Sequence, residues 1–145
     1  MSEAQIEAWF PSLHHLNYHI TSPSTPFYNC VAWAAGVIDR PWWPFDGGGN
    51  YWPPQAPREL TVPAFIAAFS TLGYAVCEND QLEPHFEKIA IYAKEGLPQH
   101  VARQLASGRW TSKLGNGEDI DHLSPPLLHG NEYGYVVVVM RRPVV

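Results

Sequence analysis

Cys30 is the residue of this 145-residue chain whose surroundings point most directly to chemistry. It opens the apolar, helix-permissive run 30–35, which follows a loop containing Pro23 and Pro26 and ends at Gly36. A cysteine in the first turn of a helix lies near unpaired backbone N–H groups and the positive end of the helix dipole, and both favour the thiolate. The pattern therefore predicts a nucleophilic cysteine.

His100 is the candidate base for this thiol. It begins the run 100–105, which alternates in polarity like a half-buried strand. A histidine at a strand start, paired with a cysteine at a helix start, could take the thiol proton during acyl transfer. In the alternative interpretation Cys30 is a small core residue and His100 is simply a polar residue at a strand end. Both interpretations stay open at this point.

A third residue would orient the imidazole. A tight-turn signal at residues 106–108 joins the strand expected at 100–105 to one expected at 109–114, which places His100 roughly opposite Gly115. The loop 116–122 then passes just beyond the strand end. The acceptor candidates in that loop, in order of preference, are Asp119, Asn116 and Glu118. The alternative is a solvated turn without a catalytic role.

The order of elements predicts a single α+β domain over residues 1–145. We expect helices over residues 2–10, 30–35 and 61–72, a loop over 11–28, and strands over 73–77, 88–93, 100–105, 109–114 and 133–141. Helices that precede hairpin-linked strands favour a helical layer packed on one antiparallel sheet, with the Cys30 helix across it. The continuously apolar run 136–139 suits a central strand buried on both faces.

Composition excludes several classes of protein. Hydrophobic residues make up 46% of the chain, charged residues 16%, and the net charge is -5, so a compact globular protein without nucleic-acid binding is expected. No apolar run reaches the length of a membrane span, and residues 1–5 lack the basic start and apolar core of a signal peptide. We therefore expect a cytoplasmic protein without a cofactor, although an effector exported without a cleaved signal would look the same.

The second cysteine and the histidine cluster have simpler interpretations. Cys77 ends a short strand-like run and is expected to be a packed thiol, free like Cys30. Three nearby imidazoles could bind zinc, namely His14, His15 and His19. No spaced carboxylate or thiol completes a tetrahedral set, so no metal is expected.

A Trp/Pro-rich loop, residues 40–54, directly follows the cysteine helix. Its Pro and Gly residues exclude a regular helix or a central strand. It could pack as a lid on the core, or it could form a wall of a substrate cleft or a partner-docking surface. We favour packing with one edge lining the groove, and name Trp33, Trp43 and Trp52 as candidate substrate contacts.

The run Asn29–Trp33, followed by a His-led strand, resembles the papain-like superfamily, particularly the NlpC/P60 and CHAP amidases. The run Lys88–Ala93 is similar to the strand that those families place near the catalytic histidine. In the NlpC/P60 branch the cysteine follows Asp and precedes Ser or Gly, and the histidine leads the strand of the form His-Val-Gly-Ile-Tyr. Here Asn29 and Val31 flank the cysteine, and Lys88 starts the corresponding strand. These departures put the cell-wall substrate of that branch in question.

The whole chain also resembles a family of small bacterial proteins that carries no established function. The shared segments are Asn29–Ala34, Tyr51–Pro53, Glu87–Ala90 and Arg109–Gly115.

Two functions are therefore carried forward. The first is a thiol hydrolase or acyl transferase acting on an amide or thioester bond, with Cys30 as nucleophile, His100 as base and Asp119 as orienting residue. Asn29 or the backbone N–H of Cys30 would hold the oxyanion. The second is a non-catalytic module on the same scaffold that docks a protein partner through the Trp/Pro-rich loop. Fast alkylation of Cys30 at neutral pH would favour the first.

Overall fold

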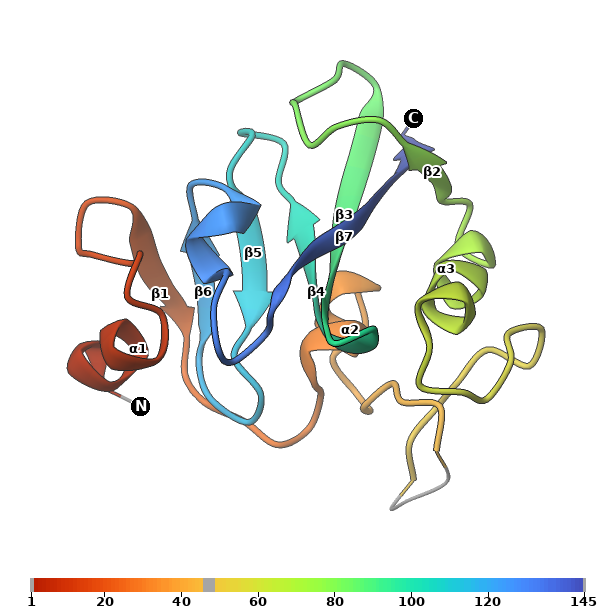
Figure 1. Ribbon diagram of the computed structural model, residues 1–145, viewed down its shortest axis with the longest axis horizontal. Coiled ribbons are helices and arrows are strands. Elements are labelled where there is room, and N and C mark those ends of the chain that lie inside the picture. The colour runs from red at the N-terminus through yellow and green to blue at the C-terminus, as the bar shows by residue number, and fades with distance from the viewer. Residues whose placement is uncertain (1, 46–48, 145) are drawn as a thin grey trace.

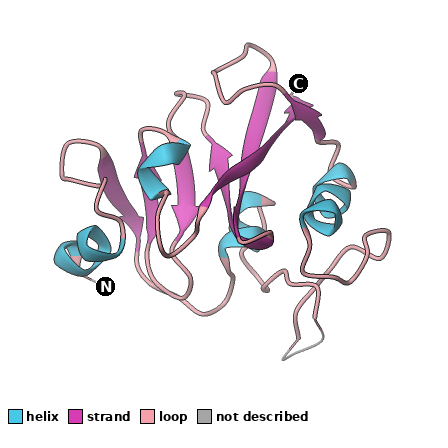
Figure 2. Ribbon diagram, viewed as in Figure 1, coloured by secondary structure: helices cyan, strands magenta, loops and turns pink. Residues whose placement is uncertain are grey.

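The computed structural model describes residues 2–45 and 49–144 and contains one antiparallel sheet with helices around it (Figures 1 and 2). The sheet has seven strands in the order β1-β6-β5-β4-β3-β7-β2. They are β1 (Tyr18–Ser22), β2 (Ala75–Cys77), β3 (Phe86–Lys94), β4 (Leu97–Gln104), β5 (Trp110–Lys113), β6 (Asp119–His122) and β7 (Tyr135–Pro143). This arrangement confirms the α+β class.

Side-chain caps begin the three α-helices, which lie where the sequence predicts helices. The helices are α1 (Glu3–Trp9), α2 (Cys30–Ala34), α3 (Val62–Ser70) and the 3-10 helix η1 (Pro125–Leu128). Ser2, Asn29 and Thr61 each accept a hydrogen bond from a backbone N–H in the first turn, which satisfies donors that the helix itself leaves unpaired. In the described part of the chain, none of these helices has the length and apolar character needed to cross a membrane.

Other elements cover both faces of the sheet, and a separate hydrophobic core lies on each face. The α2 face carries Ile89, Ile91 and Val101, which pack against α2 and α3. The other face, here called the Tyr92 face, carries Ala90, Tyr92 and Ala102, which pack with residues of α1 and η1. Figure 1 shows α1 beside β1 at one end of the sheet and α3 near β2 at the other. The prediction of helices packed on one antiparallel sheet is confirmed, and helices lie against both faces of that sheet.

Three local predictions need correction. Residues 18–22 and 119–122 were expected to be loop, but they form β1 and β6, which pair with each other. The run 136–139 was expected to be a central strand buried on both faces. It lies in β7, which is next to the edge strand β2, and Val137 is 50% exposed. The hairpin between β4 and β5 is confirmed, with the N–H of Leu105 bonded to the carbonyl of Arg109.

The Trp/Pro-rich loop packs on the core with irregular backbone. Trp42 and Trp52 are almost fully buried, and the Trp52 ring lies 5.1 Å from that of Phe65 in α3. An isolated bridge joins Trp42 to Tyr51 across the loop. Residues 46–48 of this stretch lie outside the described residues. The described part of the loop is thus a structural cover for α3.

Candidate functional site

Cys30 is the first residue of α2 and is 8% exposed. Burial raises the pKa of its thiol to about 11, although hydrogen bonds from the backbone of Val101, Val31 and Cys30 itself and the charge of Lys113 act in the opposite direction. The thiol is therefore protonated at neutral pH, inside a set of groups that would stabilise a thiolate. A base is needed to remove its proton.

Asn29 has a structural role that uses both polar atoms of its amide. Its Oδ1 accepts from the backbone N–H groups of Ala32 and Trp42, at 3.0 Å each, and its Nδ2 donates to the carbonyl of Trp42 at 2.7 Å. The side chain therefore caps α2 and anchors the start of the Trp/Pro-rich loop. One N–H of Nδ2 is used in this way, and the second N–H of Nδ2 and the backbone N–H of Cys30 stay the candidates for holding an oxyanion.

His100 lies in β4, fully buried, and is bonded to Ser112 rather than to Asp119. The Oγ of Ser112 is 2.9 Å from His100 Nε2 and 2.8 Å from His122 Nε2. His122 Nδ1 in turn lies 2.9 Å from the carbonyl oxygen of Ser124. A chain of hydrogen bonds therefore runs from the backbone of Ser124 through two imidazoles and one hydroxyl.

This chain determines where the protons lie. Burial lowers the pKa of His122 to about 4. Burial, and to a smaller extent the charge of His122, holds the pKa of His100 well below its usual value. Both rings are therefore neutral at pH 7. The carbonyl of Ser124 can only accept, so His122 carries its proton on Nδ1 and Ser112 donates to its Nε2. Ser112 then accepts from His100 Nε2–H. His100 Nδ1 is left with a lone pair, and it is buried without a hydrogen-bond partner in the part of the chain that the structure describes.

Cys30 and His100 lie on opposite faces of the sheet. Val101 belongs to the core of the α2 face together with Cys30, whereas His100 contacts Tyr92 and stacks on Tyr133 with ring centroids 4.1 Å apart. Successive residues of a strand point to opposite faces, so the one-residue step from Val101 to His100 separates thiol and imidazole. The expected hydrogen bond between Cys30 and His100 is not formed.

β4 and β5 separate near the contact between β4 and Cys30. The two strands pair only over the last two residues of β4, Arg103 and Gln104. Val101, whose backbone contacts Cys30, lies in the part of β4 that pairs with β3 but not with β5. Burial raises the pKa of Tyr133 well above its usual value, and a negative charge on Cys30 would add to this, so the ring that stacks on the imidazole lies within electrostatic range of the sulfur.

Asp119 lies on the α2 face, at the start of β6. Its Oδ2 accepts from the hydroxyl of Tyr28 at 2.5 Å, and its Oδ1 is buried without a hydrogen-bond partner among the described residues. Lys113, also buried, lies opposite Asp119 in the β5–β6 ladder, and its Nζ is 5.2 Å from the Tyr28 ring centroid. Burial lowers the pKa of Lys113, although Asp119, Glu118 and Cys30 raise it. Asp119 therefore belongs to the surroundings of Lys113, not to His100 as predicted.

The remaining predicted site residues have local roles. Asn116 is exposed in the turn between β5 and β6. Trp33 stacks on Tyr28 and donates from Nε1 to Thr111 Oγ1 at 2.9 Å, which ties α2 to β5. Trp43 and Trp52 both pack on α3, and Trp52 also donates to a backbone carbonyl. Of the three predicted tryptophans, Trp33 is thus the one that belongs to the cysteine helix α2 itself.

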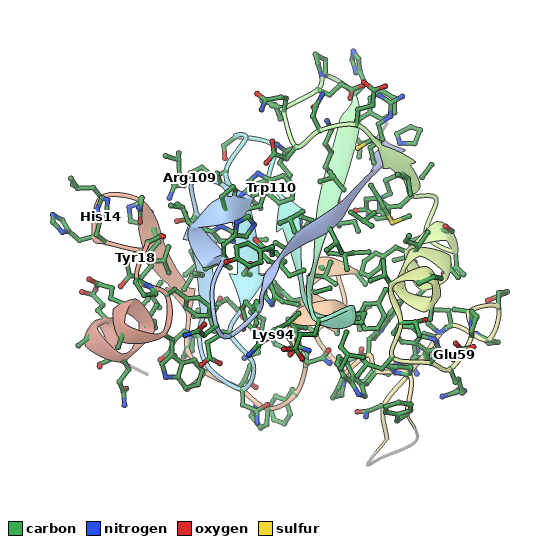
Figure 3. All side chains as sticks on the ribbon, viewed as in Figure 1. His14, Tyr18, Glu59, Lys94, Arg109 and Trp110 are labelled. Carbon is green, nitrogen blue, oxygen red and sulfur yellow. The ribbon has the colours of Figure 1, made fainter. Side chains whose placement is uncertain are left out.

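The rings of His14 and His15 contact each other, with centroids 6.2 Å apart, but His19 has a different partner. His14 lies in the loop between α1 and β1, on its outer side (Figure 3), and its Nδ1 accepts from the N–H of Leu16. His19 Nδ1 lies 2.9 Å from Asp121, which also binds Arg109. Within residues 2–45 and 49–144, no three His, Cys, Asp or Glu side chains are placed to hold a metal ion. Both cysteines are free thiols, as predicted.

Sequence reasoning missed Ser112, Lys113 and His122. The signal was present in the alternation of residues 110–114, which places Ser112 with Trp110 on one face and Lys113 on the other. The same alternation in residues 119–122 separates His122 from Asp119. The expectation of a single loop over residues 116–122 hides this alternation, because alternation assigns faces only within a strand.

The fold and the site define a small α+β protein with a helix-start cysteine held against an antiparallel sheet. Over residues 19–141 the chain matches the family model described as a domain of unknown function, DUF7689, and it belongs to that family. Comparisons with curated proteins and with solved structures find no match.

Proposed function

We propose that this protein is a thiol hydrolase or acyl transferase that acts on an amide or thioester bond, with Cys30 as nucleophile and His100 as base. The observation that carries the proposal is the free lone pair of His100 Nδ1, buried in β4, the strand whose backbone contacts Cys30. A neutral, unpartnered imidazole nitrogen is an unusual buried group, and such groups concentrate at functional sites.

In this mechanism the proton of Cys30 passes to His100 Nδ1 through a bridging water or substrate group, because the two are not directly bonded. The sulfur attacks the carbonyl carbon, a thioester forms, and the proton is delivered to the leaving amine or thiol. Water then cleaves the thioester in a hydrolase, or a second nucleophile does so in a transferase. Lys113 would stabilise the thiolate, and the backbone N–H of Cys30 the oxyanion.

The chain order of the site supports a papain-like core. A cysteine begins a buried helix that packs on an antiparallel sheet, and a histidine follows on a later strand. The orienting group differs from the one expected. Ser112, backed by His122, takes the place that Asp119 or Asn116 was predicted to fill.

Burial of the cysteine favours a second candidate, a non-catalytic binding module. A thiol that is 8% exposed with a raised pKa is typical of a packed core residue. Beside it, the Trp/Pro-rich loop leaves Phe45 exposed, and the adjoining segment leaves Ile38 exposed, which gives a partner an apolar contact.

Thiol labelling in a Cys77→Ala background tests the two candidates. The folded protein is treated with iodoacetamide from pH 6 to 10, the adduct is measured by intact mass, and hydrolysis of thioesters and peptide anilides is assayed in parallel. Under the catalytic proposal Cys30 is labelled without unfolding, hydrolysis is lost in Cys30→Ala, and His100→Gln slows both reactions by at least about 10-fold.

The control compares the labelling rate of Cys30 with the rate at which the protein unfolds in urea. If Cys30 reacts only at the rate at which urea exposes it, and if Cys30→Ala and Cys77→Ala do not differ in hydrolysis, then Cys30 is a core residue. The enzyme proposal then fails and the binding module takes its place.

A further inference from the structure

The sheet contains a notch between β3 and β4, at the end away from the β3–β4 hairpin. β3 pairs with β7 from Phe86 onward, but it pairs with β4 only from Ile89 onward. β4 does not continue beside it, because the chain turns after Gln104 into the hairpin with β5. Backbone N–H and C=O groups of successive strand residues point to alternate edges, so the stretch 86–88 presents only part of its backbone polar groups to the notch, and the N–H of Phe86 is already bonded to the carbonyl of Glu83.

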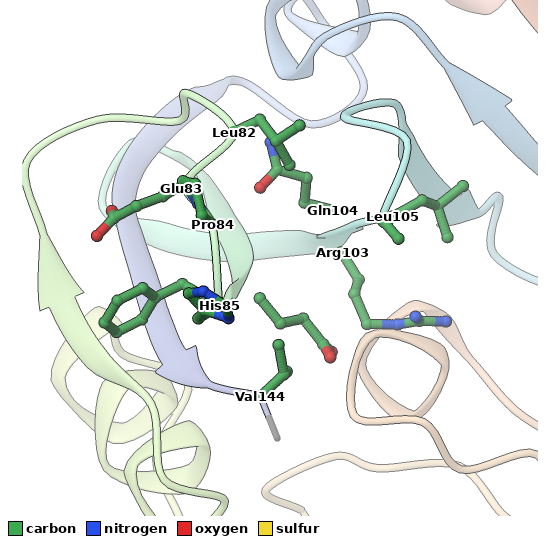
Figure 4. Close-up of a pocket in the computed structure, with 11 residues that line it drawn as sticks. Leu82, Glu83, Pro84, His85, Arg103, Gln104, Leu105 and Val144 are labelled. Carbon is green, nitrogen blue, oxygen red and sulfur yellow. The ribbon is translucent and has the colours of Figure 1, made fainter.

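A cavity of about 550 Å³ occupies this notch (Figure 4). Its apolar walls are formed by Leu82 and Pro84 from the segment before β3, by Leu105 and Ala106 from the segment after β4, and by Val144. The volume lies within the range of small-ligand sites, and an apolar lining with few polar groups is typical of them.

Gln104 supplies a polar atom that lacks a partner. It lines the cavity, is 4% exposed, and its Oε1 forms no hydrogen bond among the described residues. Its Nε2 is fixed by the carbonyl of Asp80 at 3.1 Å, so the orientation of the amide is set. Figure 4 shows the amide extending toward the segment that carries Leu82 and Pro84. A buried carbonyl oxygen without a partner is energetically costly, and a ligand that donates an N–H hydrogen bond to it would remove this cost.

The two carboxylates of the cavity are already paired, whereas Nε of Arg103 is buried without a hydrogen-bond partner among the described residues. Glu83 is paired with two cations, and Glu87 accepts from a tyrosine hydroxyl and an arginine. The guanidinium of Arg103 extends away from residues 82–85, toward the ring of Trp33 in α2. The free acceptor, the unpaired strand edge and the apolar walls together fit an uncharged amide with an apolar side chain.

We propose that the notch binds an extended peptide segment. One backbone N–H of the peptide donates to Gln104 Oε1, and a small apolar side chain lies between Pro84 and Leu105. The peptide backbone runs along the free edge of β3 at residues 86–88, in the manner of an added strand. This site is separate from Cys30 and does not depend on the thiol proposal.

The test is a titration of the ¹⁵N-labelled protein with N-acetyl-Leu-Val N-methylamide, followed by ¹H–¹⁵N correlation spectra. Analogues that replace each N–H in turn by an ester oxygen are titrated in the same way. Saturable shifts are expected at residues 82–88 and 104–106, and one ester analogue is expected to bind at least about 5-fold more weakly. Gln104→Leu should bind that analogue and the parent peptide equally.

Ala106→Trp fills the cavity from an exposed position and should abolish binding, whereas the matched exposed substitution Ile38→Trp should not. Because the ester analogues need no mutation, a misfolded variant does not block the test. The proposal is overturned if no saturation occurs, if all ester analogues bind like the parent, or if the shifts lie elsewhere. Tighter binding of the free acid N-acetyl-Leu-Val would also overturn it, because Arg103 would then be the recognition group.

Discussion

The hydroxyl of Ser112 lies 2.9 Å from Nε2 of His100, and this contact determines which nitrogen of the histidine is free. The hydroxyl has one proton, which it donates to His122, so it must accept from His100. The serine thus holds the imidazole in the tautomer whose Nδ1 can act as a base. In Ser-His-Asp hydrolases an orienting carboxylate has this role, and under the proposed function a hydroxyl backed by a second histidine would take it.

Tautomer states provide the most direct check of this arrangement. At pH 7 we expect His100 to be protonated on Nε2 alone and His122 on Nδ1 alone, because the carbonyl of Ser124 can only accept. Long-range ¹H–¹⁵N spectra of the imidazole rings distinguish the two tautomers. A His100 ring protonated on Nδ1 would leave no lone pair for the thiol proton and would remove the basis of the catalytic proposal.

Ser112→Ala should destabilise the protein by about 2–4 kcal/mol, because two buried imidazole nitrogens lose their partner at once. Urea unfolding at pH 7 measures the change. The matched control is Ser24→Ala, at an exposed loop position, for which a change within about 0.5 kcal/mol is expected. A loss below 1 kcal/mol for Ser112→Ala would mean that the serine does not hold the two rings.

Local signals predicted the three α-helices, each of which has a capping side chain at its start, but not the 3-10 helix η1, which has none. Ser2, Asn29 and Thr61 are short polar residues before apolar runs, and their caps depend only on neighbouring residues. The hairpin between β4 and β5 was predicted for the same reason, since its turn is local. By contrast, β1 and β6 are short and polar and are stabilised by pairing with each other across about a hundred residues.

The site was predicted in part only, because strand register decides its geometry. Cys30 and His100 were placed on the correct elements, but a single residue step along β4 sends Val101 to one face and His100 to the other. The same rule puts Asp119 on the α2 face and His122 on the Tyr92 face. Periodicity could have assigned these faces only if β6 had been recognised as a strand.

Acid should destabilise the protein through its buried histidines. His122 has a pKa of about 4 in the folded protein against an ordinary value near 6.5, so between these values the unfolded chain binds a proton that the native state does not. The free energy of unfolding therefore falls as pH decreases from 6.5 to 4, by about 3 kcal/mol from His122 alone. His100, whose pKa is also lowered, acts in the same direction.

Urea unfolding at pH 7 and pH 4.5 measures this effect. Carboxylates also titrate in this range, so His122→Gln serves as the comparison. The variant should lose less stability on acidification than the original protein, whatever its stability at pH 7. Equal losses would show that His122 is accessible to protons in the native state.

Trp52→Ala should cost about 3–5 kcal/mol of stability, because the ring is almost fully buried against Phe65 and its Nε1 donates to the carbonyl of Pro57. Phe45→Ala, on the same loop but 52% exposed, should change stability by less than about 0.5 kcal/mol. Thermal unfolding of both variants measures the difference. Similar small effects for both would mean that the loop is not a structural cover and would favour its use as a docking surface.

Tyr28→Phe isolates the hydrogen bond that links the loop before α2 to the buried Asp119. The variant keeps the ring that stacks on Trp33 but removes the donor that lies 2.5 Å from Asp119 Oδ2. Since Oδ1 has no hydrogen-bond partner among the described residues, the carboxylate would then lose the hydrogen bond from Tyr28 while staying buried near Lys113. Burial, with the hydrogen bond to Asp119 second, raises the pKa of Tyr28 to about 12, so the donor is present at all moderate pH values.

The expected loss is about 1–3 kcal/mol, measured by urea unfolding at pH 7. Tyr135→Phe, at a tyrosine that is mostly exposed, is the matched control and should change stability by less than about 0.5 kcal/mol. The alkylation rate of Cys30 is measured in Tyr28→Phe and Tyr135→Phe as well, because Asp119 raises the pKa of Lys113 and Lys113 lowers that of Cys30. If Tyr28→Phe costs stability but leaves the alkylation rate of Cys30 unchanged, the Tyr28–Asp119 contact is structural. A change in that rate without loss of stability would instead connect the contact to the cysteine.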